Sequence, residues 1–176
     1  LGRLGRTRGW RGLERNGGQR QEFTGPLRLR GGIRPRPLPS CMRAHLIQLD
    51  IAWEAPSTNR ERVSRLLEQA RPGPGDLVVL PEMFDTGFSF RLGATVDHEG
   101  ETLAFLTQLA RRWGVTVHGS RTVSGESGRG RNVSSVVGPD GSLLCEYNKQ
   151  RPFELGPVGA RECDCFEAGT SPGLYT

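Results

Sequence analysis

Several features that would assign this sequence to a common protein class are missing from it. No apolar run approaches the ~20 residues that a membrane-spanning helix needs, so we expect no membrane-spanning segment. The cysteines lack the spacing of a disulfide framework, and the Cys-Asp-Cys pair has no second pair or nearby histidines to complete a zinc site. We therefore expect a reducing, cytoplasmic compartment. The four cysteines are Cys41, Cys145, Cys163 and Cys165.

Acidic residues are scarce at the start of the chain. Residues 1–41 contain ten arginines but only Glu14 and Glu22, a net charge of about +8, which leaves residues 42–176 at about −3. This leader is rich in Gly, Arg and Pro and has no helical or strand periodicity, which predicts disorder. Three explanations compete for this leader: a nucleic-acid-binding arm, an organelle transit peptide, or translated sequence upstream of the true start.

The leader lacks what the first two explanations require. Trp10 and Phe23 are its only aromatic residues, so few rings could stack on bases, and we do not expect nucleic acid as a partner. Unlike a transit peptide, it is neither serine-rich nor amphipathic. We favour a start at Met42, which divides the chain into the leader, residues 1–41, and a folded domain, residues 42–176.

Apolar periodicity beyond the leader predicts alternating strands and helices. Residues 43–51 are a strand candidate, and residues 77–80 are an apolar run between Asp76 and a proline, typical of a short, fully buried strand. Residues 59–71 and 101–113 have the spacing of amphipathic helices, and a further buried strand begins at residue 115. In the first helix the apolar positions are Val63, Leu66, Leu67 and Ala70.

A hairpin follows these elements. Residues 132–137 and 142–147 are rich in strand formers and flank a Pro-Asp-Gly turn, in which Pro presets φ and Gly accepts a positive φ. The order β-α-β-α-β-β-β predicts an α/β fold with a mixed sheet. We expect loops at residues 85–97 and 154–164.

The stretch LVVLPEMF, residues 77–84, places a carboxylate at the end of a buried strand. Pro81 cannot donate to a sheet ladder, so strand pairing should stop there. Glu82 then lies beside Met83 and Phe84, where poor solvation would raise the pKa of a carboxyl toward the range of a general base. The alternative is a solvent-exposed carboxylate at a strand end.

Lys149 follows the second hairpin strand, in YNKQRPF, and would alone indicate a surface charge. The order of motifs is more informative: LPEMFDTGF, then RNVSS, the Pro-Asp-Gly turn, and Tyr-x-Lys followed by Phe. This ordered set resembles the carbon–nitrogen hydrolase (nitrilase) superfamily, and LPEMFDTGF looks most like its ω-amidase branch. The resemblance runs from about Met42 to the end of the chain.

The resemblance implies a four-layer α-β-β-α sandwich, incomplete here at its C-terminus, and a Glu-Lys-Cys catalytic set that hydrolyses small non-peptide amides. Glu82 matches the general base, and Lys149 matches the lysine that stabilises the tetrahedral intermediate. Glu162 matches a second glutamate of the family, the alternative being an exposed loop charge. No metal or organic cofactor is implied, and a homo-oligomer of the family type is expected.

The nucleophilic cysteine of the family follows an Ala-Gly turn, but Cys163 and Cys165 precede Ala168-Gly169. The resemblance therefore places the nucleophile outside this chain, and Cys145 is interpreted as a small core residue. Two functions follow: the N-terminal part of an ω-amidase-like hydrolase that acts on a small amide, or an inactive fragment or binding module associated with RNA through its basic leader.

Overall fold

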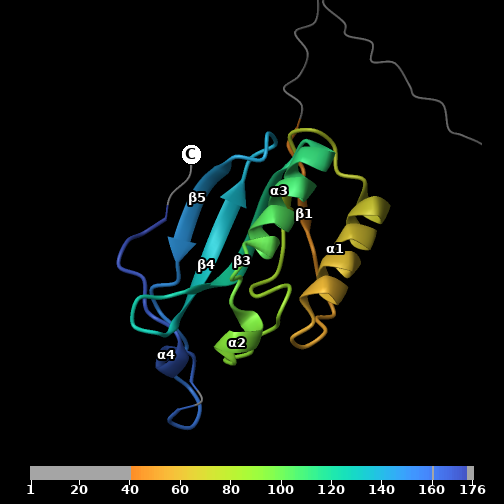
Figure 1. Ribbon diagram of the computed structural model, residues 1–176. Coiled ribbons are helices and arrows are strands. Elements are labelled where there is room, and N and C mark those ends of the chain that lie inside the picture. Colours follow the sequence, from red (N-terminus) through yellow and green to blue (C-terminus); the bar gives the residue numbers. More distant parts are fainter. Residues whose placement is uncertain (1–40, 160, 174–176) are drawn as a thin grey trace, which may run out of the picture. The chain divides into compact units, whose positions relative to one another are not determined.

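The computed structural model describes residues 41–159 and 161–173 (Figure 1), so the predictions for the leader fall almost wholly outside the described residues. No helix in these two ranges has the length and apolar character to cross a bilayer. The elements are β1 (Ala44–Leu46), α1 (Pro56–Ala70), β2 (Leu77–Val79), α2 (Leu92–Thr95), α3 (Glu101–Trp113), β3 (Thr116–Ser124), β4 (Gly130–Val137), β5 (Leu143–Asn148) and α4 (Glu162–Cys165).

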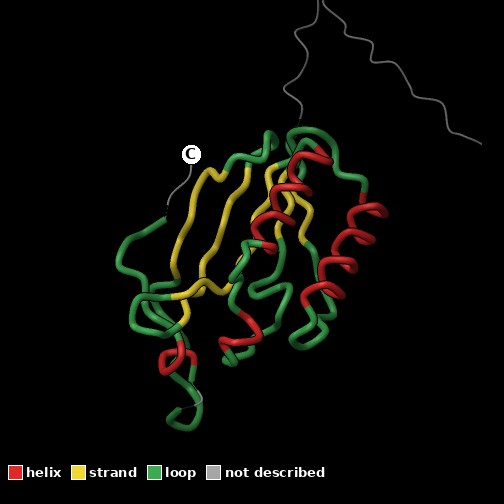
Figure 2. Tube along the Cα trace, viewed as in Figure 1, coloured by secondary structure: helices red, strands yellow, loops and turns green. Residues whose placement is uncertain are grey.

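The five strands form one mixed sheet in the order β1-β2-β3-β4-β5 (Figure 2). β1, β2 and β3 run parallel, with Val78 opposite His45 on one side and Val117 on the other. β3, β4 and β5 pair antiparallel. The predicted α/β class and mixed sheet are confirmed. These residues supply a sheet and one helical layer; the second sheet and second helical layer of a four-layer sandwich stay predictions.

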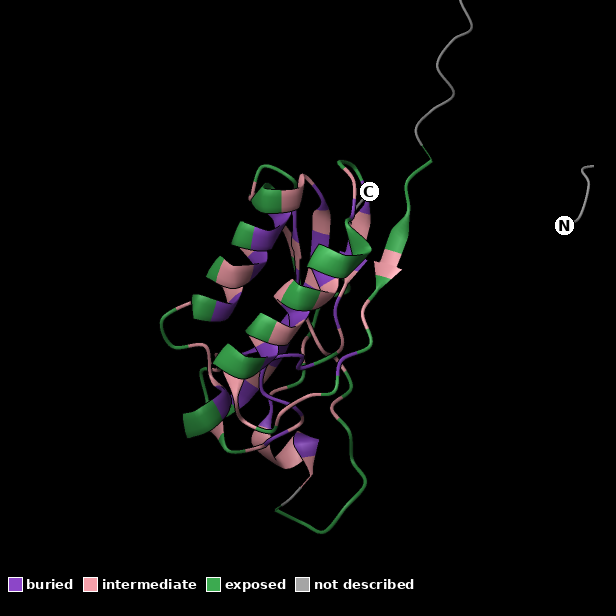
Figure 3. Ribbon diagram, turned by 90° about the vertical axis from the view of Figure 1, so that its right-hand side faces the viewer, coloured by how far each residue is buried: buried purple, intermediate pink, exposed green. Residues whose placement is uncertain are grey.

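The two long helices lie side by side over one face of the sheet (Figure 1) and turn their buried sides toward it (Figure 3). α1 starts at Pro56 rather than at the predicted Asn59, because proline fits the first helical turn, where no N–H partner is needed. α3 has the predicted bounds, and Gly114 ends it with a positive φ. The core between helices and sheet contains Leu49, Val63, Leu67, Val78, Leu80, Phe84, Leu106, Leu109, Ala110, Val115, Val117 and Val137.

Burial along β2 alternates, so the prediction of a fully buried strand is wrong. Val78 is fully buried against the helices, whereas Leu77 and Val79 are only partly buried. The physical reason is that successive side chains of a strand point to opposite faces and α1 and α3 cover only one face. The other face of the sheet is available for the site described below.

Several element boundaries differ from the predicted ones. β1 is shorter than residues 43–51, and β3 continues to Ser124 through its pairing with β4. The predicted loops 85–97 and 154–164 contain the short helices α2 and α4. Four residues span barely one helical turn, so no apolar periodicity could reveal either helix.

The predicted Pro-Asp-Gly hairpin is confirmed. The amide of Gly141 donates to the carbonyl of Gly138 over 2.8 Å, and Gly138 donates to Ser142 over 2.8 Å. Gly141 has a φ of 83°, which explains the glycine at this position. The carboxylate of Asp140 accepts from the amide of Ser142 at 2.9 Å and closes the turn.

Asn59, fully buried on α1, ties together the loops that follow β1 and β2. Its Oδ1 accepts from the amide of Ala52 at 2.8 Å, and its Nδ2 donates to the carbonyls of Ala52 and Asp85, each at 2.7 Å. The second loop begins after Val79 and contains Glu82, so this amide helps to fix the chain three residues after Glu82.

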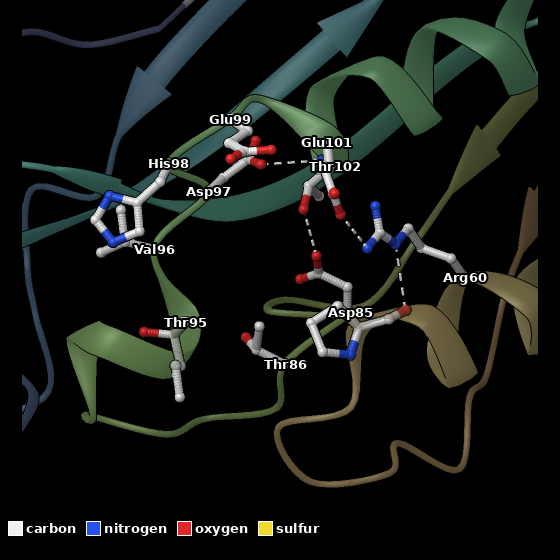
Figure 4. A pocket seen from close by; sticks show the side chains of 12 residues that line it. Arg60, Asp85, Thr86, Thr95, Val96, Asp97, His98, Glu99, Glu101 and Thr102 are labelled. Atoms are coloured by element: carbon white, nitrogen blue, oxygen red, sulfur yellow. Dashed lines mark hydrogen bonds and ion pairs between the residues drawn. The ribbon is translucent and has the colours of Figure 1, made fainter.

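A pocket of about 240 Å³ lies where this loop meets α1 and the start of α3 (Figure 4). The carboxylate of Asp85 points to the hydroxyl of Thr102, and the guanidinium of Arg60 points to Glu101, 2.7 Å away. Asp97 accepts from the amide of Thr102 at 3.0 Å, one of the amides in the first turn of α3 that have no partner within the helix. These contacts join three elements, and we assign the pocket a structural role.

The three hydrogen bonds of the Asn59 side chain, called the Asn59 clamp below, lead to a stability prediction. Asn59→Ala leaves three backbone groups without their side-chain partner and is expected to lower the free energy of unfolding by about 2–4 kcal/mol, measured by urea denaturation. Ser64→Ala on the same helix removes only a bond to the Arg60 carbonyl and is the control, with an expected change below about 0.5 kcal/mol. Equal losses in both variants would contradict the clamp.

A second prediction concerns pH. Burial raises the pKa of Asp85 despite the Thr102 bond, so the folded state holds that proton more tightly than the unfolded chain, and the wild type loses stability as pH rises above about 3.8. Asp85→Asn keeps an acceptor for Thr102 without the charge. We expect it to raise the free energy of unfolding at pH 7.5, with the gain vanishing near pH 3.5.

The same substitution at Asp140 serves as a control of opposite sign. Hydrogen bonds from Ser142 lower the pKa of Asp140, so the wild type gains stability from this carboxylate above pH 3.8 and loses it as pH falls. Asp140→Asn is therefore expected to be destabilising at pH 7.5. A stability change of Asp85→Asn that is the same at both pH values would refute a role for its charge.

Candidate active site

Three charged side chains that are distant in the sequence meet at one end of the sheet. Lys149 Nζ lies 2.9 Å from Glu82 Oε1 and 2.9 Å from Glu162 Oε2. Glu82 follows β2, Lys149 follows β5, and Glu162 opens α4. The structure thus brings together all three residues singled out in the sequence.

A sharp backbone turn after β2 positions Glu82. Met83 has a φ of 51°, its amide donates to Ser120 Oγ at 2.7 Å, and its carbonyl accepts from Gly87 at 2.8 Å. The turn buries Met83 and Phe84 in the protein. The Glu82 side chain remains 46% exposed, so the expectation of a poorly solvated carboxylate is wrong: the turn sends its neighbours into the core and leaves Glu82 at the open face.

The backbone and side chain of Lys149 are both fixed. Its amide donates to the carbonyl of Asn132 and its carbonyl accepts from Gly169, each at 2.9 Å. Nζ lies 5.2 Å from the ring centroid of Phe88, within cation–π range. Burial lowers the pKa of Lys149, but hydrogen bonds to Glu162 and Glu82 outweigh burial and hold the pKa above its usual value. The ammonium is therefore charged at neutral pH.

Glu162 is fully buried, so its interpretation as an exposed loop charge is wrong. Its Oε2 accepts from Lys149 and from the amide of Phe153, at 2.9 and 2.7 Å, and its Oε1 accepts from Asn132 Nδ2 at 3.1 Å. Three donors, one of them a cation, compensate the cost of removing a carboxylate from water.

The segment that carries Glu162 is anchored to the sheet next to β4. Phe166 is 1% exposed, and the amide of Glu167 donates to the Gly130 carbonyl at 2.7 Å. A side chain at Gly130 would place its Cβ 2.8 Å from Leu92 and 3.1 Å from Phe166, so glycine permits this close approach. Hydrogen bonds from Ser127, and then from Arg131, lower the pKa of Glu167 to about 2, which keeps this anchor ionised.

Asn132 is a polar contact of the site that sequence reasoning did not assign. Its Nδ2 lies 2.7 Å from Glu82 Oε1 and 3.1 Å from Glu162 Oε1, and the residue is 4% exposed. The residue lies within the RNVSS motif, but only the tertiary structure shows that this strand faces both glutamates. Strand alternation could have paired it with Ser134 on one face, without identifying what that face meets.

Beside the charged cluster the sheet face forms a cavity of about 270 Å³. His118 lies within β3, and its Nε2 is 2.6 Å from Ser134 Oγ. Burial lowers the pKa of His118, which keeps the imidazole neutral at pH 7. The lining residues are Leu80, Glu82, His118, Ser120, Asn132, Ser134, Tyr147 and Lys149.

None of the four cysteines, all within the described ranges, lines this cavity. Cys163 and Cys165 lie on α4, partly buried. Cys145 is also partly exposed, so its interpretation as a core residue is wrong: it lies on β5, the edge strand, away from the helices that cover the core. No group of three or more His, Cys, Asp or Glu side chains suited to a metal ion occurs in the described part of the chain.

Comparison with known proteins identifies relatives of this arrangement. A family profile described as carbon-nitrogen hydrolase matches residues 43–175. Omega-amidase NIT2-B of Xenopus laevis is 26% identical over 124 residues, 68% of this chain and 45% of that protein. A nitrilase of Pyrococcus abyssi is 33% identical over 130 residues, 67% of this chain and 49% of that protein.

Solved structures agree with the sequence comparisons. A CN-hydrolase superfamily protein from Xanthomonas campestris, with an arsenic adduct in its active site, is 33% identical with a TM-score of 0.64, over 74% of this chain and 47% of that chain. An amidase of Nesterenkonia is 21% identical with a TM-score of 0.62 and shows the shared fold alone. The chain spans about half the length of the relatives it matches. It belongs to the carbon-nitrogen hydrolase family.

Proposed function

We propose that this chain supplies the acid–base and electrostatic part of an amide hydrolase, with small ω-amides of 2-oxo dicarboxylic acids as the substrate class. The observation that carries the proposal is the convergence of Glu82, Lys149 and Glu162 beside a cavity on the sheet face. Family membership supports the hydrolysis of carbon–nitrogen bonds, and the ω-amidase relatives, at 26–30% identity, support the substrate class.

Glu82 is proposed as the general base. Its carboxylate lines the cavity and is partly solvated, so it can exchange protons with a group bound there. A thiol is a poor nucleophile until it becomes a thiolate, and Glu82 would accept its proton. The thiolate then attacks the amide carbon. Ammonia leaves with that proton. Glu82 next takes a proton from the water that attacks the thioester, and as the C–S bond breaks and the carboxylic acid forms, this proton goes to the departing sulfur.

Lys149 is proposed to stabilise the tetrahedral intermediate. The amide oxygen gains a full negative charge as sulfur attacks, and a cation held beside it interacts more strongly with this state than with the neutral amide. The two glutamates maintain the charge of Lys149, and the two backbone hydrogen bonds fix its position. Glu162 binds the ammonium from the buried side and keeps it from rotating away.

The nucleophile is assigned to none of the four cysteines of this chain, because none of them lines the cavity. Relatives about twice as long suggest that it comes from a part of the fold that these residues do not contain. The burial pattern of β2 supports the four-layer sandwich. The partly buried Leu77 and Val79 lie on the sheet face that a second sheet would cover. A homo-oligomer and a cytoplasmic location are part of the proposal.

The test measures ammonia release from 2-oxosuccinamate, an ω-amide of a four-carbon 2-oxo dicarboxylic acid, by the full product of the gene. Glu82→Gln removes the base and is expected to lower kcat about 10²–10⁴-fold. Lys149→Met removes the cation and is expected to lower kcat about 10²–10³-fold. Glu68→Gln, an exposed glutamate on α1, is the matched control and is expected to leave kcat unchanged.

Two outcomes would contradict the proposal. Full activity of Glu82→Gln would exclude this residue as the base. If the 176-residue chain alone released ammonia and Cys163→Ala or Cys165→Ala abolished the reaction, the placement of the nucleophile outside this chain would be wrong. For the 176-residue chain alone, the proposal expects no ammonia release above the buffer rate.

A further inference from the structure

We propose that Asn132 is a positioning residue: its side-chain amide binds one oxygen of Glu82 and one of Glu162, and thereby leaves Glu82 Oε2 as the oxygen that accepts the proton. This inference rests on the proposed function of Glu82 as the base. It assigns a role to a residue that touches both carboxylates without itself taking part in bond making.

The first argument is that the two carboxylate oxygens of Glu82 differ in their hydrogen-bond partners. Oε1 accepts from Asn132 Nδ2 at 2.7 Å and from Lys149 Nζ at 2.9 Å. Oε2 has no hydrogen-bond partner among the residues that the structure describes. Two donors on one oxygen stabilise its negative charge and make it the weaker base, so a proton is taken more readily by Oε2.

The second argument is the orientation of the amide. An ionised carboxylate can only accept hydrogen bonds, so a side chain that binds two carboxylates must turn its NH₂ group toward both. The two hydrogens of Asn132 Nδ2 match the two acceptors, Glu82 Oε1 and Glu162 Oε1. No other side-chain type of similar size offers two such donors from one neutral nitrogen. Because this amide carries no charge, the positive charge that balances the two carboxylates comes from Lys149.

The third argument is rigidity. Asn132 is 4% exposed and lies on β4, between β3 and β5, where it faces Thr122 in the ladder. Its backbone carbonyl also accepts from the amide of Lys149 at 2.9 Å. One residue therefore contacts the base, the cation and the second glutamate. The relative positions of these three groups therefore depend on one residue within the sheet.

The experiment compares the wild type with Asn132→Leu, which has a similar volume and no donor. Carbon-13 labels on the glutamate carboxyls report the hydrogen bonding of each carboxylate through its chemical shift, measured by NMR in the full chain at pH 7.5. We expect the signals of Glu82 and Glu162 to move in the variant, because each carboxylate loses a donor. Asn148→Leu, on the neighbouring β5, is the control: no hydrogen bond joins its side chain to either glutamate.

Activity gives a second readout. In the gene product that hydrolyses the ω-amide, Asn132→Leu is expected to lower kcat at least tenfold with KM within about twofold. A merely structural role would lower the yield of folded protein and leave kcat per folded molecule unchanged. Should Asn132→Leu fail to fold, Asn132→Thr, a good strand former with one donor, is expected to move one of the two carboxyl signals.

A failure of the proposed function can be told apart from a failure of the role of Asn132. Absence of amide hydrolysis in the wild type would refute the proposed function, whereas the carboxyl signals still decide whether Asn132 binds the two glutamates. Unchanged carboxyl signals in a folded Asn132→Leu variant would overturn the inference. So would an equal shift in Asn148→Leu, because the effect would then follow from any loss of an amide in this part of the sheet.

Discussion

The fully buried carboxylate of Glu162 is the constraint on which the arrangement of the site depends. An ion removed from water must be compensated by donors, and here they come from β4, from the end of β5 and from the loop backbone at Phe153. These partners lie up to 30 positions away in the sequence. Satisfying one carboxylate therefore fixes three segments relative to one another, and Lys149 is held where it also meets Glu82.

The two faces of the sheet differ in composition and role. One face is covered by α1 and α3 and contains the apolar core. The other presents polar side chains such as His118 and Ser134 around a cavity. This division follows from the alternation of side chains along each strand, because one residue buried under a helix leaves the next directed to the opposite face. The apolar core and the polar cavity therefore lie on opposite faces of the same sheet.

Prediction from the sequence was most accurate where a local pattern has a local cause. The helix over residues 101–113 has apolar residues on one face and a terminal glycine, and its bounds are those predicted. The Pro-Asp-Gly hairpin was also predicted correctly from its local sequence. The burial of Glu82 was predicted wrongly, because a strand-end position does not tell which way the next turn sends a side chain. Asn132 went unassigned, since its partners lie on other strands and loops.

By itself the sequence determined the α/β class and the order of the strands and long helices. It also placed Glu82 and Lys149 in one ordered set of motifs, and the family resemblance added Glu162 as a candidate. Those properties depend on residue types and spacings along a few turns of chain. Only the tertiary structure decided that Glu162 is buried, that Lys149 bridges two carboxylates and that Asn132 joins them. Hydrogen bonds and burial depend on which segments meet in space, and the meeting of β2, β4, β5 and α4 is a property of the whole sheet.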